Sequence, residues 1–243
     1  EMRVINKKNF VKEMLSGLEV RSILEIILTA TGFFVMTLGI FRNDLLAFFV
    51  GGFVFVLCGY MYELKLTQAR IWRAGLLGQK KVEEVLLKLD NRYILLNNLS
   101  LPFKNCDIDH LLVGPNGVFL IETKNYKGEI SCTGDLWEYQ KVGKMGGIYK
   151  GYITNPSRQL KRNVWELKSF LDKKSKRLFG SNEFPYWIQG MVVFTNEEAV
   201  LNTKDETVVI LKVNDLYDYI KNFKKTKIPE DDIEKIASLL KEL

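Results

Sequence analysis

The residues best suited to chemistry in this 243-residue chain are Asp109, Glu122 and Lys124, which flank a short turn near its middle. The turn is Gly114-Pro115-Asn116-Gly117, and a short apolar run precedes and follows it. Proline presets the first central position of such a turn, and asparagine and glycine accept the conformations that follow. Short runs rich in Leu, Val, Ile and Phe are typical of buried strands, so residues 107–124 predict a β-hairpin.

The register of this hairpin decides whether the charged side chains meet. If Gly114 to Gly117 form a symmetric loop, Asp109 lies opposite Glu122 and Asp107 lies opposite Lys124. Directly opposed residues have Cβ atoms about 4.5–5.5 Å apart, and residues two apart along a strand share a face. A three-residue bulged turn would shift the register by one and place the two carboxylates on opposite faces.

Two carboxylates this close repel each other unless a cation lies between them. Their oxygens suit hard divalent ions such as Mg²⁺, which activate water and stabilise a phosphoryl transition state, and a nearby lysine adds positive charge. The alternative is a plain cross-strand ladder of salt bridges. The apolar run before Glu122 argues against this ladder, because buried charges are costly unless they are paired or bound to metal.

These residues resemble a known family. Asp109 followed by Glu122-Thr123-Lys124 matches the D…(D/E)-x-K arrangement of the restriction-endonuclease-like PD-(D/E)XK superfamily. The segments 107–110, 114–117 and 121–125 are similar to the nuclease-related domain, NERD, and the resemblance runs from about Gly75 to about Asn196. It implies an α/β fold with a mixed sheet and an αβββαβ core, and a metal-dependent nuclease, that is, a hydrolase with Mg²⁺ or Mn²⁺ as cofactor.

The resemblance also implies roles for individual residues. Asp109 and Glu122 would hold the metal together with the carbonyl of Thr123. Lys124 would orient the attacking water or stabilise the developing charge. A glutamine near the start of the helix after the central strands belongs to the family's site, so Gln159 is carried over as a site residue.

The chain departs from the family pattern at one position. Gly78-Gln79 stands where the family usually has Gly-Glu, so one carboxylate that faces the site is missing. Glu83 lies one helical turn further on the same face as Gln79, and it is the candidate to replace that carboxylate. The basic residues expected to neutralise phosphates are Lys127, Lys144, Arg158, Lys161 and Arg162.

Two apolar runs of twenty residues, 22–41 and 45–64, carry the strongest physical signal in the chain. About 20 helical residues span the hydrocarbon core of a bilayer, and a tight polar turn with only Arg42 as a basic residue joins the runs. We therefore predict a transmembrane helical hairpin. Glu25 is expected to snorkel to the interface rather than to mark an ion path, and Gly51-Gly52 and Gly59 are expected to pack helix against helix.

The charges beside the two runs predict the topology. Five basic residues precede the hairpin and five follow it, against one in the turn, so the positive-inside rule places both termini and the catalytic domain in the cytoplasm. The lipid bilayer of the cell membrane is thus one expected partner. The flanking basic residues are Arg3, Lys7, Lys8, Lys12 and Arg21 before the hairpin and Lys65, Arg70, Arg73, Lys80 and Lys81 after it.

The chain divides into four segments: a basic amphipathic N-terminal segment 1–21, the hairpin 22–64, a connecting helix 65–78, and a NERD-like cytoplasmic domain 79–243. Segment 1–21 fits either a helix on the membrane surface or a partly ordered tail. In the domain we expect helices at 79–89, 155–172 and 229–243, a short helix after 214–215, and strands at 93–98, 128–132, 136–142, 187–194 and 208–213.

Composition narrows the function further. A formal net charge of +6 suits nucleic acid or an anionic membrane surface, and charge alone does not choose between them. The single histidine, His110, excludes a multi-histidine metal site and is expected to pack on the face away from the carboxylates. Cys58, Cys106 and Cys132 have no paired or metal-ligand spacing and are expected to be reduced thiols.

Three functions remain in competition. The first is a membrane-anchored metal-dependent nuclease that cleaves DNA phosphodiester bonds on the cytoplasmic side. The second is a catalytically inactive nucleic-acid-binding or scaffold module of a membrane assembly, which Gln79 favours. The third is a subunit of a membrane complex whose soluble domain is a docking surface. The sequence does not choose between DNA and RNA as the substrate. It also leaves open the cutting pattern and whether the protein forms a homo-oligomer.

Overall fold

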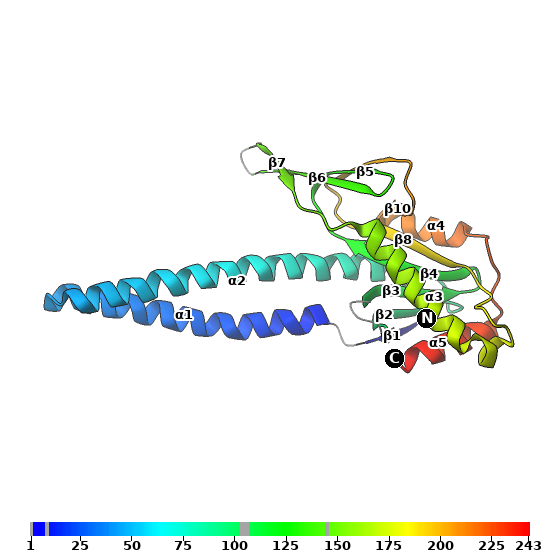
Figure 1. The fold of residues 1–243 in the computed structure, drawn as a ribbon, viewed down its shortest axis with the longest axis horizontal. Helices are drawn as coiled ribbons and strands as arrows, with labels where there is room; N and C mark the ends of the chain where they lie inside the picture. Colours follow the sequence, from blue (N-terminus) through cyan, green and yellow to red (C-terminus); the bar gives the residue numbers. More distant parts are fainter. Residues whose placement is uncertain (1, 8–9, 103–106, 144–145) are drawn as a thin grey trace. The chain divides into compact units, whose positions relative to one another are not determined.

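A computed structural model describes residues 2–7, 10–102, 107–143 and 146–243. The chain forms two compact units, which Figure 1 shows with their elements labelled. Residues Asn9–Leu76 form the helical unit, and Glu1–Lys8 together with Leu77–Leu243 form the α/β unit. The helical unit is therefore an insertion in the sequence of the α/β unit.

The helical unit consists of α1 (Phe10–Arg42) and the greater part of α2 (Leu45–Leu86). Both helices are long and apolar enough to cross a membrane. Asn43 takes a positive φ of 54°, which asparagine tolerates, and the Asp44 carboxylate accepts the backbone N–H of Ala47 at 3.1 Å as a helix N-cap. The expected connecting helix 65–78 is an unbroken continuation of α2.

Small residues let the backbones of α1 and α2 approach closely. A Cβ atom added to Gly32, Gly39 or Gly51 would lie only 2.3–2.6 Å from a backbone nitrogen of the facing helix. Gly52 and Gly59 lie at ordinary contact distance, so a methyl group would be tolerated there. Of the three glycines expected to pack the helices, only Gly51 is a position where no larger residue fits. Two further such positions, Gly32 and Gly39, lie on α1. Small residues are a common means of packing apolar helices in lipid.

The Glu25 side chain makes an ion pair that the sequence did not predict. Its carboxylate Oε1 lies 2.5 Å from the Lys65 ammonium of the facing helix, and both side chains are largely buried. An isolated charge among apolar side chains is costly, and an opposite charge within reach removes much of that cost. A second, exposed ion pair joins Glu19 to Arg73 at 2.8 Å.

The α/β unit is built on a six-stranded mixed sheet with the order β1-β2-β3-β4-β8-β10. The end of α2, then β2, β3 and β4, then α3 and β8 form the expected αβββαβ core of the α/β class. The elements are β1 (Arg3–Asn6), β2 (Ile94–Ser100), β3 (Asp107–Gly114), β4 (Gly117–Lys124), α3 (Pro156–Phe179), β8 (Ile188–Phe194) and β10 (Val209–Lys212).

A second sheet of four strands, in the order β7-β6-β5-β9, is inserted around α3 and β8 in the chain. A short 3₁₀ helix and two α-helices complete the unit. The elements are β5 (Gly128–Thr133), β6 (Leu136–Val142), β7 (Ile148–Gly151), β9 (Ala199–Lys204), η1 (Val213–Asp215), α4 (Leu216–Asn222) and α5 (Glu230–Lys241).

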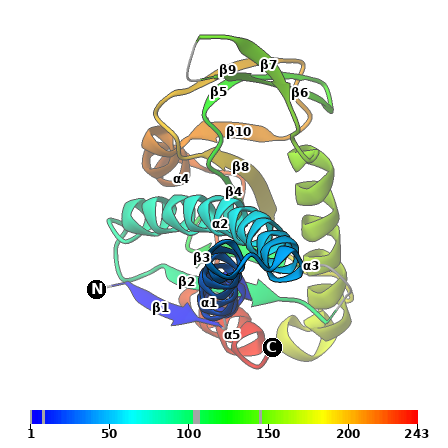
Figure 2. The same cartoon turned by 90° about the vertical axis from the view of Figure 1, so that its left-hand side faces the viewer.

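Helices cover both faces of the large sheet, and Figure 2 shows α3 and α4 on opposite sides of its strands. Leu111 and Leu120 pack into a core with α3 and α5, whereas their neighbours Leu112 and Phe119 pack into a second core with α4 and the end of α2. Strands buried on both faces read as continuous apolar runs, which explains the sequence on each side of the turn.

The N-terminal segment differs from expectation. Residues Arg3–Asn6 form β1, which pairs in parallel with Ile94–Asn97 of β2, so neither a surface helix nor a tail describes them. Met2 is buried in the core beside α4 and the end of α2, and this burial fixes the strand. A strand whose partner lies about ninety residues away in the chain leaves little local sign of itself.

The C-terminal end of α3 also differs from expectation. The helix continues to Phe179, seven residues beyond the expected end. Gly180 then takes a left-handed conformation with φ of 70°, and its N–H bonds to the Lys176 carbonyl. The basic run Lys173–Arg177 is therefore helical. Its exposed side chains continue the surface that begins at the start of α3.

Candidate active site

The hairpin has the symmetric register, as predicted. Val113 pairs with Val118, and the last Cα pair toward the charged ends joins His110 to Ile121. Asp109 lies one position beyond that pair, opposite Glu122. Its Oδ2 accepts the backbone N–H of Thr123 at 2.8 Å, so the side chain continues the ladder where the backbone pairing stops.

Glu122 and Lys124 form a buried ion pair on one face of β4. The Lys124 ammonium donates to Glu122 Oε1 at 2.7 Å, and the two side chains are 14% and 4% exposed respectively. The expected pairing of Asp107 with Lys124 is wrong. Asp107 is exposed and its carboxylate accepts the Ser100 hydroxyl at 2.7 Å, because the β3–β4 ladder has ended before it.

The start of α3 adds Gln159 to this cluster. Asn155 caps the helix by accepting the backbone N–H of Arg158 at 2.9 Å, and Pro156 occupies the first position, as the sequence predicts. One turn into the helix, Gln159 Oε1 accepts from the Lys124 ammonium at 3.2 Å. The Lys124 ammonium thus has two acceptors, Glu122 and Gln159.

The end of α2 brings Gln79 to the other carboxylate. A Cβ atom at Gly78 would lie 2.8 Å from the Thr195 hydroxyl and 3.1 Å from the Asn125 Cβ, so only glycine allows this approach. Gln79 Nε2 then donates to Asp109 Oδ1 at 2.7 Å. Both oxygens of Asp109 are engaged, one by this amide and one by the β4 backbone.

Burial and charge shift the acidity of the site. Burial and then the nearby charge of Asp109 raise the pKa of Glu122 to about 7, against the opposing effect of Lys124 and Arg162. Burial lowers the pKa of Lys124, but the charge of Glu122 and its hydrogen bond outweigh this, so the net shift is upward. The lysine is therefore charged at neutral pH, and Glu122 is poised between its two forms.

His110 is a packed histidine, as expected. Its ring is buried, and its Nδ1 donates to Asn97 Oδ1 at 2.7 Å, because the Asn97 amide nitrogen donates to Asn6. Burial lowers the pKa of His110 to about 4, so the ring is neutral at pH 7. It stabilises the pairing of β1, β2 and β3 rather than acting on a substrate.

The pKa of Glu122 predicts a dependence of stability on pH. A carboxyl group whose pKa is raised on folding binds its proton more tightly when folded, so stability falls as pH rises from about 4.5 through 7. In EDTA, the wild-type chain should lose about 2–3 kcal/mol relative to Glu122→Gln between pH 5 and pH 8.5. Thermal unfolding of both proteins across this range measures it. A stability difference that is the same at every pH contradicts the prediction.

Two buried oxygen atoms of the site could serve as ligands of a hard metal ion. Glu122 Oε2 and Thr123 Oγ1 are buried and have no hydrogen-bond partner, although buried polar atoms normally have one. Across the described ranges there is no group of three or more His, Cys, Asp or Glu side chains placed to share an ion. A metal here would therefore rest on Asp109 and Glu122, with amide or backbone oxygens completing its ligands.

Glu83 does not join the site. It is half-buried on α2, and within the part of the chain that the structure describes no hydrogen bond or ion pair connects its side chain to the two carboxylates. Gln79, rather than Glu83, makes the contact that the helix contributes. The sequence favoured Glu83 because it lies about one helical turn after Gln79, on the same face. Whether a side chain on that face contacts the carboxylates depends on how the end of α2 packs against the sheet.

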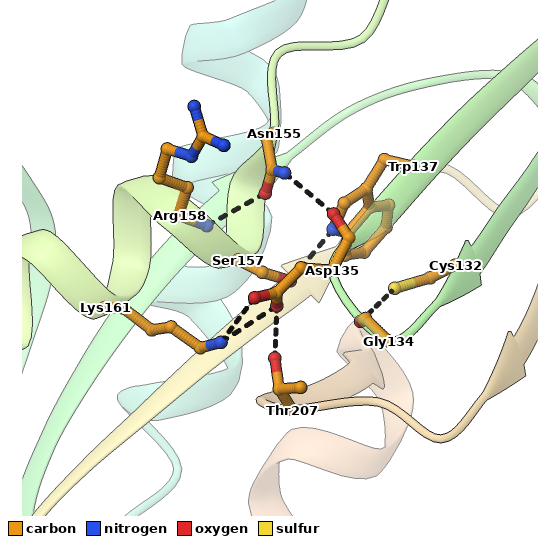
Figure 3. Close-up of polar contacts among 9 residues, drawn as sticks. All are labelled: Cys132, Gly134, Asp135, Trp137, Asn155, Ser157, Arg158, Lys161 and Thr207. Atoms are coloured by element: carbon orange, nitrogen blue, oxygen red, sulfur yellow. Dashed lines mark hydrogen bonds and ion pairs between the residues drawn. The ribbon is translucent and has the colours of Figure 1, made fainter.

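Of the basic residues expected to contact phosphates, two form ion pairs with carboxylates of the protein. Lys127 pairs with Glu198 at 2.6 Å and Lys161 pairs with Asp135 at 2.7 Å. Figure 3 shows Asp135 accepting from Lys161 and from Thr207, with the Arg158 guanidinium pointing away from this cluster. Lys144 lies outside the described residues, as does Cys106.

The αβββαβ core and its Asp-Glu-Lys cluster define a nuclease-related domain of the restriction-endonuclease-like class. Residues 74–195 match the nuclease-related domain (NERD) family, and the chain belongs to that family. It is similar to an uncharacterized protein of Bacillus anthracis, with 25% identity over 176 residues that cover 68% of this chain and 74% of the relative. No solved structure matches the chain.

Proposed function

We propose that this protein is a membrane-anchored, metal-dependent nuclease that cleaves DNA phosphodiester bonds on the cytoplasmic side. The observation that carries the proposal is the buried Glu122 carboxylate, which lies beside the charge of Asp109 and keeps one oxygen without a partner. Structural burial of such a group lowers stability, and a functional ligand explains why the chain retains it.

Each residue of the cluster has a role in this proposal. Asp109 and Glu122, with the Thr123 carbonyl, would hold Mg²⁺ or Mn²⁺. When bound, such an ion supplies an acidified water and a positive charge for the phosphoryl oxygens. Lys124 keeps its ammonium charge beside the scissile phosphate and stabilises the charge that develops there. Gln159 orients Lys124 through its side-chain oxygen.

One specific contact favours the inactive nucleic-acid-binding module instead. The Gln79 amide donates to Asp109 Oδ1, so an N–H group occupies an oxygen that a metal would need. In an active enzyme this amide must move or turn its oxygen toward the ion. In a binding module it simply holds Asp109 in place.

Exchange of Gln79 distinguishes the two functions. Gln79→Glu adds a third carboxylate, so Mn²⁺ affinity should rise by roughly tenfold or more. If the protein is a nuclease, the wild type should already cleave plasmid DNA in Mg²⁺ and not in EDTA. Calorimetric titration with Mn²⁺ and a plasmid assay on the full chain in detergent measure both. Glu83→Gln is the control and should change neither. Wild-type and Gln79→Glu proteins that bind DNA without cutting it would establish the binding module.

The insertion of the hairpin supports the proposed membrane topology. Residues 1–8 and 77–243 belong to one compact unit, so a chain that enters the bilayer after residue 8 must return to the same side before residue 77. Two spans satisfy this condition and one does not. Together with the excess of basic residues on both flanks, it supports a cytoplasmic α/β unit with the Arg42 turn outside.

Cysteine labelling on intact cells tests this topology. Asn43 has a positive φ that cysteine tolerates poorly, so the adjacent and exposed Arg42 is the better position. Arg42→Cys should react with an impermeant thiol reagent, whereas Gln68→Cys should react only after the cells are opened. The wild-type chain reports any labelling of its native cysteines. Labelling of Gln68→Cys on intact cells, with none of Arg42→Cys, would reverse the orientation.

A further inference from the structure

Helix α3 concentrates the positive charge of the protein. Its 24 residues include eight Lys or Arg and two Asp or Glu, which gives a formal charge of +6, equal to that of the whole 243-residue chain. The remainder of the molecule is therefore neutral on balance. A charge excess confined to one helix points to a ligand rather than to a general need for solubility.

Four of the eight basic residues of α3 lie on one face of the helix. Its opposite face is buried, with Leu160 and Leu167 in the core against the sheet. Helical periodicity places five exposed residues along the outer face, with the half-buried Ser169 between the third and the fourth, and we call this set the α3 stripe. These residues are Arg158, Arg162, Trp165, Lys173 and Lys176.

Two further lysines border the stripe and are held by carboxylates. Lys161 pairs with Asp135 at 2.7 Å, and Lys168 pairs with Asp172 at 2.8 Å. Asp135 also accepts from Thr207, and its carbonyl accepts from the capping Asn155, so this turn fixes the start of α3 (Figure 3). These pairs offset the two border lysines, and the stripe itself contains four basic residues and no acidic one.

Helix stability does not explain the charges at the start of α3. The helix dipole favours cations in the last turn, which accounts for Lys176, but it disfavours them near the first turn. Arg158 lies in the first turn and Arg162 follows one turn later, and the first turn contains no acidic residue. Arg158 therefore weakens the helix slightly, and a bound anion would offset that cost.

The stripe begins at the candidate active site. Gln159, the neighbour of Arg158, accepts from the Lys124 ammonium, and the charge of Arg162 acts on Glu122. From Arg158 to Lys176 the helix rises about 27 Å at 1.5 Å per residue. At 3.4 Å per nucleotide of one strand, that length corresponds to roughly eight base pairs of duplex DNA.

We propose that the α3 stripe binds the phosphate backbone of a nucleic acid and leads the strand away from the catalytic cluster, with Trp165 as the apolar contact at its centre. The inference rests on the proposed nuclease function, because the strand is said to lead away from the cut only if the residues at the start of the stripe carry out cleavage. Lys173 and Lys176, at the far end of the stripe, would then contact phosphates several nucleotides from the cut. An anionic membrane surface would not require a stripe that starts at this cluster.

The salt dependence of binding tests the stripe without any cleavage. The full chain in detergent is titrated with a 20-base-pair DNA duplex in EDTA at several salt concentrations. Each lost phosphate contact reduces the slope of log K against log salt by about 0.9, so Lys173→Gln/Lys176→Gln should reduce it by about two. At 0.1 M salt the affinity should fall by roughly ten- to hundredfold. Lys88→Gln/Lys224→Gln removes two exposed lysines elsewhere and should leave the slope unchanged.

Trp165 provides a second readout at the centre of the stripe. It is 64% exposed, so a bound duplex should change its fluorescence. That change should be absent from Trp165→Phe, which keeps an aromatic ring and the same charge. Fluorescence that responds equally in both proteins would place the nucleic acid elsewhere.

The possible results separate this inference from the proposed function. A chain that cleaves DNA normally, with an unchanged slope in the distal variant, overturns the stripe and keeps the nuclease. A chain that never cleaves, but shows the expected loss of slope, keeps the stripe and overturns the nuclease. Phosphatidylserine vesicles serve as the competing ligand. A distal variant that loses vesicle binding while duplex binding persists would assign the stripe to lipid and overturn the inference.

Discussion

Replacement of Glu122 by glutamine should lower the rate of Mg²⁺-dependent DNA cleavage by at least about 10²–10³-fold. Glutamine has the shape of glutamate, so the packing at the end of β4 is preserved while the charge that would hold the metal is lost. The affinity for Mn²⁺ should fall with it. The affinity for a DNA duplex in EDTA should stay the same or rise, because one carboxylate no longer repels phosphate.

Glu122 is the better of the two carboxylates for this test. Asp109 also accepts hydrogen bonds from Gln79 and from the backbone of Thr123, so its replacement would disturb the structure as well as the charge. Asp107→Asn is the matched control, since Asp107 is exposed on the neighbouring strand β3 and makes its contact with Ser100. It should cleave like the wild type. A Glu122→Gln protein that keeps more than a tenth of the wild-type rate would remove the carboxylate from the reaction.

Replacement of Lys124 by methionine should lower kcat by about 10²–10³-fold for a different reason. Methionine keeps the length and apolar part of the side chain but removes the charge beside the scissile phosphate. The metal ligands remain, so saturating Mg²⁺ should not restore the rate. A variant that regains the wild-type kcat at high Mg²⁺ would reduce Lys124 to a structural partner of Glu122.

The loss of Lys124 should also change how metal binding depends on pH. The ammonium lowers the pKa of Glu122 to about 7, so without it that pKa is higher. Protons then compete with the metal at neutral pH, and Mn²⁺ should bind Lys124→Met more weakly than wild type at pH 7 but about equally at pH 9. Lys127→Met is the control, because Lys127 is exposed and pairs with Glu198 outside the cluster. It should bind Mn²⁺ like the wild type at both values.

The local chemistry of the chain was sufficient for much of this structure. Gly114 to Gly117 imposed a symmetric turn, and the turn alone set the register that brings Asp109 opposite Glu122. Asn155 and Pro156 marked the start of α3, because capping involves residues only a few positions apart. The length and hydropathy of the two apolar runs identified the helices of the hairpin. Each of these features depends on interactions between near neighbours in the sequence.

Contacts between distant segments required the tertiary structure. The strand β1 depends on a partner about ninety residues away, and the pairing of Glu25 with Lys65 depends on how two helices face each other. The expected partner of Asp107 was wrong because the backbone pairing of β3 with β4 ends at His110. Beyond that pair, side chains make the contacts in place of the backbone. Gln79 reaches Asp109 only because Gly78 lets the end of α2 dock closely on the strand ends. Residue types and local periodicity determine which elements form, but the distance between two elements is decided by the atoms that meet between them.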